Sequence, residues 1–223
     1  MRISMPAIAA GLLIALAAPA IAGTDYRELV RLDPKDPNAQ HKSAKEQAKS
    51  DLEQVIVYYN AAIKADPKDD DAYFHRGLAN FYAGAIPQAL ADLGRASKLD
   101  PQYAYYPLWI DIIDKRGSRD NRASRLAQAV AQIDMTKWPA PVVRMFLGQA
   151  TPEAVLAAAD DPDPKTKKGQ VCEANFYSGE LALQQGAKDE AVRLFRLAAA
   201  DCGHDFVEGA SARSELAALG ESQ

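Results

Sequence analysis

The histidines and the cysteines are the residues of this sequence with the most potential for chemistry. His41, His75 and His204 are scattered, and none stands in a His-Glu-x-x-His pattern or at the spacing of metal ligands. Cys202-Gly-His204 places a thiol near an imidazole, a combination that can make a nucleophile and its base. Such pairs meet in space rather than along the sequence, so this adjacency is weak evidence for thiol catalysis.

Two acid-rich stretches, 66–71 and 160–163, are the next candidates for a site. A calcium loop requires oxygen ligands at alternating positions, a central glycine and a closing glutamate, and Asp161-Pro-Asp-Pro-Lys lacks them. Both stretches are better interpreted as solvated turns. The sequence also lacks a glycine-rich phosphate loop and a Gly-x-Ser-x-Gly elbow. We therefore expect no enzyme activity, no bound metal and no cofactor.

The overall composition fits a folded, acidic protein. The chain has 223 residues, of which 48% are hydrophobic and 25% charged, and its formal net charge is −4. That hydrophobic content allows a folded core. A nucleic-acid binder needs a basic face to neutralise phosphates, and a membrane-surface protein needs clustered lysine and arginine. The acidic balance argues against both classes, so we expect no nucleic-acid partner.

The first 22 residues have the pattern of a secretory signal peptide. Arg2 precedes an apolar stretch from Ala7 to Ala18, and Ala20 and Ala22 are the small residues of a cleavage site before Gly23. The alternative is an uncleaved anchor, but the stretch is short for a membrane span. No later segment is apolar enough to cross a bilayer. We expect a soluble mature protein without stable membrane insertion, periplasmic or secreted.

Helical periodicity dominates the rest of the sequence, and no segment alternates as strands do. The clearest unit spans residues 70–101. Ala72 to Tyr82 has the pattern of an amphipathic helix, Gly84 marks a turn, and Ile86 to Leu99 has the pattern of a second helix. Asp100-Pro101 ends that helix, because proline cannot continue it.

This unit resembles a tetratricopeptide repeat (TPR), a helical hairpin of about 34 residues. In that family small residues stand where the two antiparallel helices cross, and large ones fill the space on either side. A second unit, near residues 172–203, matches less completely, with Gly203 in place of the proline. Asn80 is another departure, because the family usually has tyrosine there. The packing residues that match are Tyr73, Gly77, Ala89, Leu93, Ala96 and Pro101 in the first unit and Gly179, Ala191, Phe195 and Ala198 in the second.

The resemblance implies an all-α fold of TPR-type helical hairpins, arranged as a short right-handed superhelix with a C-terminal capping helix. It divides the chain into a signal peptide (1–22), a polar leading segment (23–50) and a TPR domain (51–223). We expect repeats near 36–69, 70–103, 104–135 and 172–203, a short helix pair at 139–160, and the capping helix at 206–219. A polar loop is expected over residues 160–168.

The hairpin geometry also bears on the two cysteines. In a helical hairpin the start of the first helix lies beside the end of the second. Cys172 begins the last repeat and Cys202 follows its second helix, so we expect them to form a disulfide. On the loop-entropy model, such a bond stabilises the protein by about 3 kcal/mol. It also suits an oxidising compartment.

The C-terminal part of the chain looks like the last repeat and cap of the NlpI family of envelope TPR lipoproteins. The resemblance implies an adaptor, often dimeric, that brings a processing protease together with peptidoglycan hydrolases. That family is anchored through an N-terminal lipid-modified cysteine, which this sequence lacks, so the likeness does not extend to anchoring. The matching residues are Asn175-Phe-Tyr177, Gly179, Leu194-Phe195, Leu197-Ala198, His204-Asp-Phe-Val-Glu208, Glu215-Leu216 and Leu219-Gly220.

Aromatic residues on the first helices supply the candidate binding surface. In a TPR superhelix these helices line a concave groove, and aromatic anchors in grooves are common in protein recognition. The alternative is that the rings pack between repeats. We expect an exported TPR scaffold or adaptor that binds other proteins or peptides of the cell envelope; a permanent structural subunit of an envelope complex is the alternative. The groove candidates are Phe74, His75, Leu78, Phe81, Tyr82, Tyr105, Leu108 and Trp109.

Overall fold

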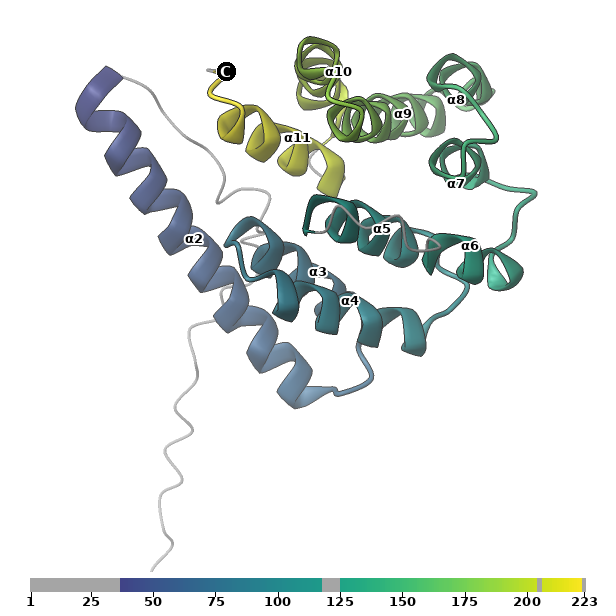
Figure 1. Ribbon diagram of the computed structural model, residues 1–223. Coiled ribbons are helices and arrows are strands. Elements are labelled where there is room, and N and C mark those ends of the chain that lie inside the picture. The colour runs from purple at the N-terminus through teal and green to yellow at the C-terminus, as the bar shows by residue number, and fades with distance from the viewer. Residues whose placement is uncertain (1–36, 118–124, 204–205, 222–223) are drawn as a thin grey trace, which may run out of the picture.

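The computed structural model describes residues 37–117, 125–203 and 206–221. Every regular element within these ranges is a helix, which confirms the all-α class (Figure 1). The predicted signal peptide (1–22) and the first half of the predicted leading segment (23–36), together with His204, lie outside the described residues. The helices are α2 (Pro37–Ala65), α3 (Asp70–Tyr82), α4 (Ile86–Leu99), α5 (Tyr105–Gly117), α6 (Arg125–Ala129), α7 (Ala140–Phe146), α8 (Pro152–Ala158), α9 (Pro164–Gln184), α10 (Lys188–Asp201) and α11 (Val207–Ala218), with a 3₁₀ turn at Val130–Gln132.

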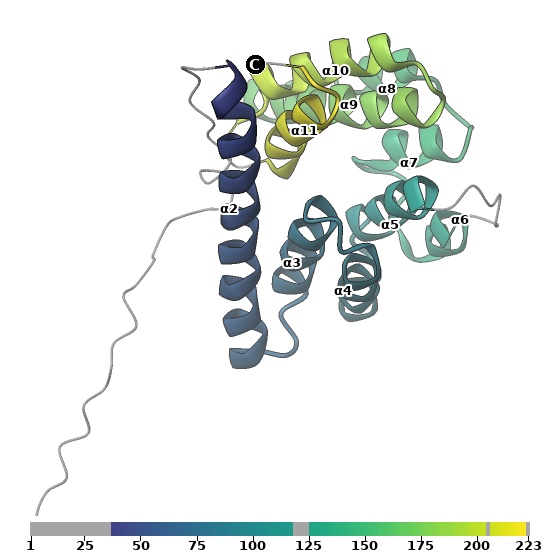
Figure 2. The same ribbon diagram turned by 60° about the vertical axis from the view of Figure 1, so that its left-hand side comes forward.

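The helices form two rows joined at one end (Figures 1 and 2). The chain runs through α3, α4, α5 and α6 in one row, turns through α7 and α8, and returns in the other row along α9, α10 and α11. Most helices pack on their neighbours in sequence, while α9 also contacts α5 and α7. This course brings the last helix, α11, back toward α3 at the open end of the two rows.

The α3–α4 hairpin follows from its local sequence. Asp69 caps α3, with its side chain accepting a hydrogen bond from the backbone N–H of Ala72 at 2.9 Å. Gly84 makes the turn with φ of +80°, a conformation that residues with a Cβ rarely adopt. At the crossing, a Cβ on Gly77 would lie 3.1 Å from Leu93 Cγ. The glycine therefore lets the two helices approach closely.

The α9–α10 hairpin repeats this design. Gly186 makes the turn with φ of +79°, and a Cβ on Gly179 would lie 2.8 Å from Phe195 Cε1. Ala191 and Phe195 are fully buried at the crossing, as Ala89 and Leu93 are in the first hairpin. Among the other packing residues, Ala96 and Ala198 are buried, Tyr73 is half-buried and Pro101 is exposed.

Two expected boundaries are wrong. Residues 36–69 do not form a hairpin, because Pro37–Ala65 is one continuous helix of 29 residues. The sequence from 38 to 65 contains neither glycine nor proline, so nothing interrupts it. The polar loop expected at 160–168 is also largely helical. Helix α9 begins at Pro164, where the Asp163 side chain accepts a hydrogen bond from Thr166 N–H at 2.8 Å.

The other expected pairs correspond in outline to helices of the described ranges. Residues 104–135 form α5, the five-residue helix α6 and a 3₁₀ turn. Asp111, which stands where the repeat pattern has glycine, is buried and pairs with Lys115 at 2.7 Å. Helices α7 and α8 correspond to the short pair, and α11 to the C-terminal helix.

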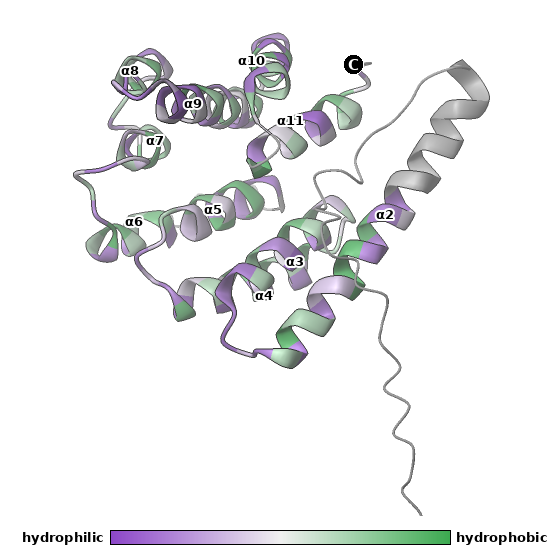
Figure 3. Ribbon diagram, turned by 180° about the vertical axis from the view of Figure 1, so that it is seen from behind, coloured by the Kyte–Doolittle hydropathy of each residue, from purple (hydrophilic) through white to green (hydrophobic). Residues whose placement is uncertain are grey.

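Figure 3 shows hydrophobic and hydrophilic residues interspersed along the helices. Accordingly, no helix in the described ranges is both long and apolar enough to cross a membrane. The apolar side chains gather inside, and the largest fully buried ones include Trp109, Phe176, Tyr177 and Phe195. The core is therefore strongly aromatic around α5, α9 and α10.

Candidate functional site

The predicted groove splits into two groups once the helices are assembled. Leu78, Leu108 and Trp109 are completely buried and Phe81 is 7% exposed. The Phe81 and Trp109 ring centroids lie 6.3 Å apart, and Trp109 lies 5.5 Å from Phe176 of α9. The returning row of helices thus covers the face of α3 and α5 that the repeat pattern left open. These four residues belong to the core and present no surface to a partner.

Tyr82 is also largely withdrawn from solvent. Its ring lies 4.9 Å from that of Phe81 and its hydroxyl is buried. Burial raises the pKa of Tyr82, and the nearby Glu215 and Glu180 raise it further. The hydroxyl therefore stays protonated at physiological pH. Tyr82 is better assigned to the boundary of the core than to the binding surface.

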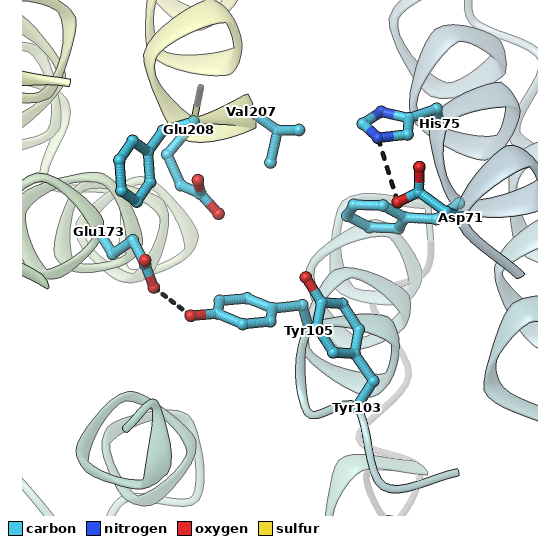
Figure 4. A pocket seen from close by; sticks show the side chains of 9 residues that line it. Asp71, His75, Tyr103, Tyr105, Glu173, Val207 and Glu208 are labelled. Carbon is cyan, nitrogen blue, oxygen red and sulfur yellow. Dashed lines mark hydrogen bonds and ion pairs between the residues drawn. The ribbon is translucent and has the colours of Figure 1, made fainter. Parts of the chain in front are cut away.

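The remaining three candidates line a cavity of about 200 Å³ at the open end of the two rows (Figure 4). Phe74 and His75 come from α3 and Tyr105 from α5. Helix α9 and the beginning of α11 supply the opposite wall. The other lining residues are Asp71, Tyr103, Glu173, Phe206, Val207 and Glu208.

His75 and Asp71 stand one helical turn apart on α3, on one side of the cavity. His75 Nε2 lies 3.3 Å from Asp71 Oδ1. The imidazole is held from behind by the ring of Tyr59, which stacks on it with centroids 5.3 Å apart. The His75 side chain is only 7% exposed whereas that of Asp71 is 73% exposed. Asp71 therefore stands at the entrance and His75 forms part of the wall.

Glu173 is the buried carboxyl group of the opposite wall and is 7% exposed. Its Oε2 atom accepts hydrogen bonds from the Tyr105 hydroxyl and, at 2.9 Å, from Trp138 Nε1. Burial raises the pKa of Glu173 to about 8, and the charge of Glu208 adds to this rise against the lowering effect of the two hydrogen bonds. Glu173 is therefore largely protonated near neutral pH.

Glu208, from the first turn of α11, faces the same space (Figure 4). Its Oε1 atom accepts a hydrogen bond from the buried Tyr177 hydroxyl at 2.9 Å. Two carboxyl groups from different helices thus meet in one cavity. This proximity is a direct electrostatic reason why Glu173 resists ionisation.

Tyrosines form the rim next to α5. Tyr103 is 42% exposed, and its ring lies 4.7 Å from Tyr106 and 5.1 Å from Tyr105. The Tyr106 hydroxyl donates to Asp70 Oδ2 at 2.5 Å, which fixes this cluster to the beginning of α3. The rim therefore offers aromatic surface held in a fixed position.

The predicted disulfide is present, and it adjoins the cavity. Cys172 and Cys202 are bonded with Cα atoms 5.1 Å apart, within the ordinary range. Cys172 immediately precedes Glu173, and the chain after Cys202 leads to the cavity residues of α11. A Cβ on Gly209 would lie 2.7 Å from Cys202 Cβ, so α11 packs directly on the bond. Because Cys202 is oxidised, it is not the nucleophile of a thiol–histidine pair.

Several cavity residues escaped the sequence-based prediction. Glu173, Phe206 and Glu208 were placed in the last repeat and cap, far from α3 along the chain. Asp71 was interpreted as part of a solvated turn. The expected disulfide was the one usable signal, since it ties the residue before Glu173 to the segment before Phe206. The disulfide could not indicate that this end of the α9–α10 hairpin faces α3.

No group of three or more His, Cys, Asp or Glu side chains in the described ranges is arranged to hold a metal ion. No family model matches the sequence. The chemistry of the cavity therefore has to be inferred from its walls.

Proposed function

We propose that this protein is an exported TPR-type scaffold that binds a protein partner at the cavity between α3, α5, α9 and α11. The observation that carries the proposal is a preformed cavity with aromatic walls and carboxyl groups from both rows of helices. A scaffold of this kind acts by holding two partners together, which raises their effective concentration for each other. The resemblance to NlpI-type envelope adaptors points in the same direction.

The dimensions of the cavity favour a peptide over a free small molecule. Pockets for drug-sized ligands enclose roughly 300–1,000 Å³. A cavity of about 200 Å³ is suited to one or two side chains of a larger partner. Tyrosine and phenylalanine are typical anchors of such contacts, because a large rigid surface is buried with little loss of conformational entropy.

The test is capture of partners from an envelope extract with tagged protein, followed by reconstitution of the binding with purified components. The pocket variant Asp71→Asn/Tyr103→Ala changes two exposed positions of the entrance. The control Tyr58→Ala removes a tyrosine of similar exposure, 55%, from α2, outside the cavity lining. We expect the pocket variant to lose partners that the control retains. Equal capture by both would refute the assignment to this cavity.

Export is a separate part of the proposal and has its own measurement. The mass of the protein recovered from its native compartment should correspond to a chain beginning at Gly23 with an intact disulfide. A chain that retains residues 1–22, or that carries two free thiols, would contradict export with signal-peptide cleavage.

A further inference from the structure

We infer that the cavity recognises a positively charged side chain, lysine or arginine, presented by the partner. This inference rests on the proposed function and specifies which chemistry the site selects. The walls combine carboxyl groups with aromatic rings, an arrangement that attracts cations by charge and through the faces of the rings.

The charge of the lining is one-sided. Three of its nine residues, Asp71, Glu173 and Glu208, carry carboxyl groups, and none is lysine or arginine. His75 is the one basic side chain of the lining, and it already contacts Asp71. A carboxylate on the partner would be repelled by this lining, whereas a cationic side chain would be attracted.

Glu173 supplies a second, independent indication. Both of the hydrogen bonds it receives end on Oε2, from the neutral donors Tyr105 and Trp138. Its Oε1 atom receives none from the described residues, although the side chain is more than nine-tenths buried. Figure 4 shows this carboxyl group directed into the cavity, toward the Tyr105 hydroxyl, with the carboxyl group of Glu208 on the same side. This oxygen is therefore available to a group that enters the cavity, and an ammonium or guanidinium group can donate a charge-assisted hydrogen bond to it once the carboxyl group ionises.

The aromatic part of the lining is placed to complete such a site. Phe74 and Tyr105 belong to the wall, Tyr103 to the rim, and Phe206 to the side opposite them. Phe206 is itself fixed, since a Cβ on Gly169 of α9 would lie 2.5 Å from its Cζ atom. The apolar stem of lysine or arginine would pack along these rings while its charged end reaches the carboxyl groups.

Nuclear magnetic resonance of ¹⁵N-labelled protein, titrated with three tripeptide probes, tests the inference through the chemical shifts of the protein. The probes are acetyl-Gly-Lys-Gly-amide, acetyl-Gly-Arg-Gly-amide and acetyl-Gly-norleucine-Gly-amide, the last a neutral analogue of the lysine probe. The reporter is the Trp138 indole N–H, which donates to Glu173 and is assigned with Trp138→Phe. We expect saturable shifts with a cationic probe and at least about tenfold weaker binding of norleucine. The stronger of the two cationic probes identifies the side chain.

Two variants locate the binding. Glu173→Gln removes the ionisable carboxyl group of the buried wall, and we expect it to weaken binding of the cationic probe by about tenfold or more. Glu190→Gln removes an exposed carboxylate of α10 outside the cavity and should leave binding unchanged. Near pH 7, binding should also release protons from wild-type Glu173, measured by calorimetry in buffers of different ionisation enthalpy.

The inference is overturned if neither cationic probe gives a saturable shift, if norleucine binds equally well, or if Glu173→Gln binds like wild type. Calcium ions that displace the cationic probe at equal concentration would also overturn it, because the site would then select charge alone. These failures are distinguishable from failure of the proposed function. Partner capture that still depends on the cavity entrance would preserve the scaffold and reject only the cationic side chain.

Discussion

At the scale of single residues, buried carboxyl groups determine how this fold responds to pH and to mutation. Glu180 is completely buried and Glu215 is 2% exposed. Both face Arg116, whose Nη2 lies 2.5 Å from Glu180 Oε2 and whose Nη1 lies 2.8 Å from Glu215 Oε1. One guanidinium cannot balance two carboxylates. Burial and the charge of Glu215 therefore raise the pKa of Glu180 to about 8 in spite of the arginine.

Glu173→Gln should stabilise the protein at alkaline pH relative to wild type. Burial raises the folded-state pKa of Glu173 to about 8, while the unfolded chain ionises near its ordinary value of about 4.3. Between these values the folded state holds the extra proton, so stability falls as the pH rises from about 5 to 8. Glutamine removes this contribution, on the order of 1 kcal/mol or more over that window. Urea denaturation of both proteins at pH 5 and pH 8 measures it. The prediction is contradicted if wild type and Glu173→Gln lose the same free energy of unfolding between the two pH values.

Arg116→Met should destabilise the protein strongly. Removing the guanidinium leaves two buried carboxyl groups of α9 and α11 without their cation, and loss of one partner of a buried pair costs about 3–5 kcal/mol. The matched control is Arg193→Met, which breaks an exposed pair with Glu190. Exposed pairs contribute about 0–1 kcal/mol. Denaturant unfolding compares the two variants. Equal losses of unfolding free energy would show that the buried ion pairs of Arg116 stabilise the fold no more than the exposed pair does.

At the scale of elements, two glycines determine how closely the paired helices pack. Gly77 lets α3 approach Leu93 of α4, and Gly179 lets α9 approach the ring of Phe195 in α10. The spacing of these small and large residues is visible in the sequence, so the two hairpins could be predicted. The repeat pattern instead predicts a hairpin over 36–69 and a loop over 160–168, although the local signals there favour the continuous helix α2 and the early start of α9.

Gly179→Ala should destabilise the α9–α10 hairpin despite the better helix propensity of alanine. The new Cβ would lie 2.8 Å from Phe195 Cε1 and 2.9 Å from Cδ1, so the ring or the helix has to move. Overpacking of this kind costs typically about 1–3 kcal/mol. Gly94→Ala is the control, because a Cβ there meets no atom within 4 Å in the middle of α4. It should stabilise by about 0.5–1 kcal/mol. If thermal unfolding shows that the melting temperatures of both variants shift in the same direction, the close crossing at Gly179 is ruled out.

At the scale of the whole molecule, aromatic rings connect the two rows of helices. Phe81 of α3 lies 6.3 Å from Trp109 of α5, which lies 5.5 Å from Phe176 of α9. Phe176 continues to Phe195 of α10 at 5.8 Å. The Arg116 cluster adds a polar link from α5 to α9 and α11. The rows therefore share one core instead of packing as independent repeats.

We expect the described helices to unfold in one cooperative transition. Both tryptophans report on the connection between the rows, since Trp109 is buried in it and Trp138 binds Glu173 of α9. Tryptophan fluorescence and far-ultraviolet circular dichroism should therefore give superimposable urea curves. Two separated transitions, with helix content lost before the fluorescence changes, would indicate that the rows unfold independently.

The sequence by itself determined the helical class, the two glycine-crossed hairpins and the disulfide between Cys172 and Cys202. All of these depend on residues within one hairpin, where spacing translates directly into geometry. Only the tertiary structure decided which aromatic residues are buried, because that depends on the return of α9 and α11 across α3 and α5. The same return turned Leu78, Leu108 and Trp109 into core and brought Glu173 and Glu208 opposite His75. Contacts between residues about 100 positions apart arise from the path of the whole chain, and no local pattern encodes that path.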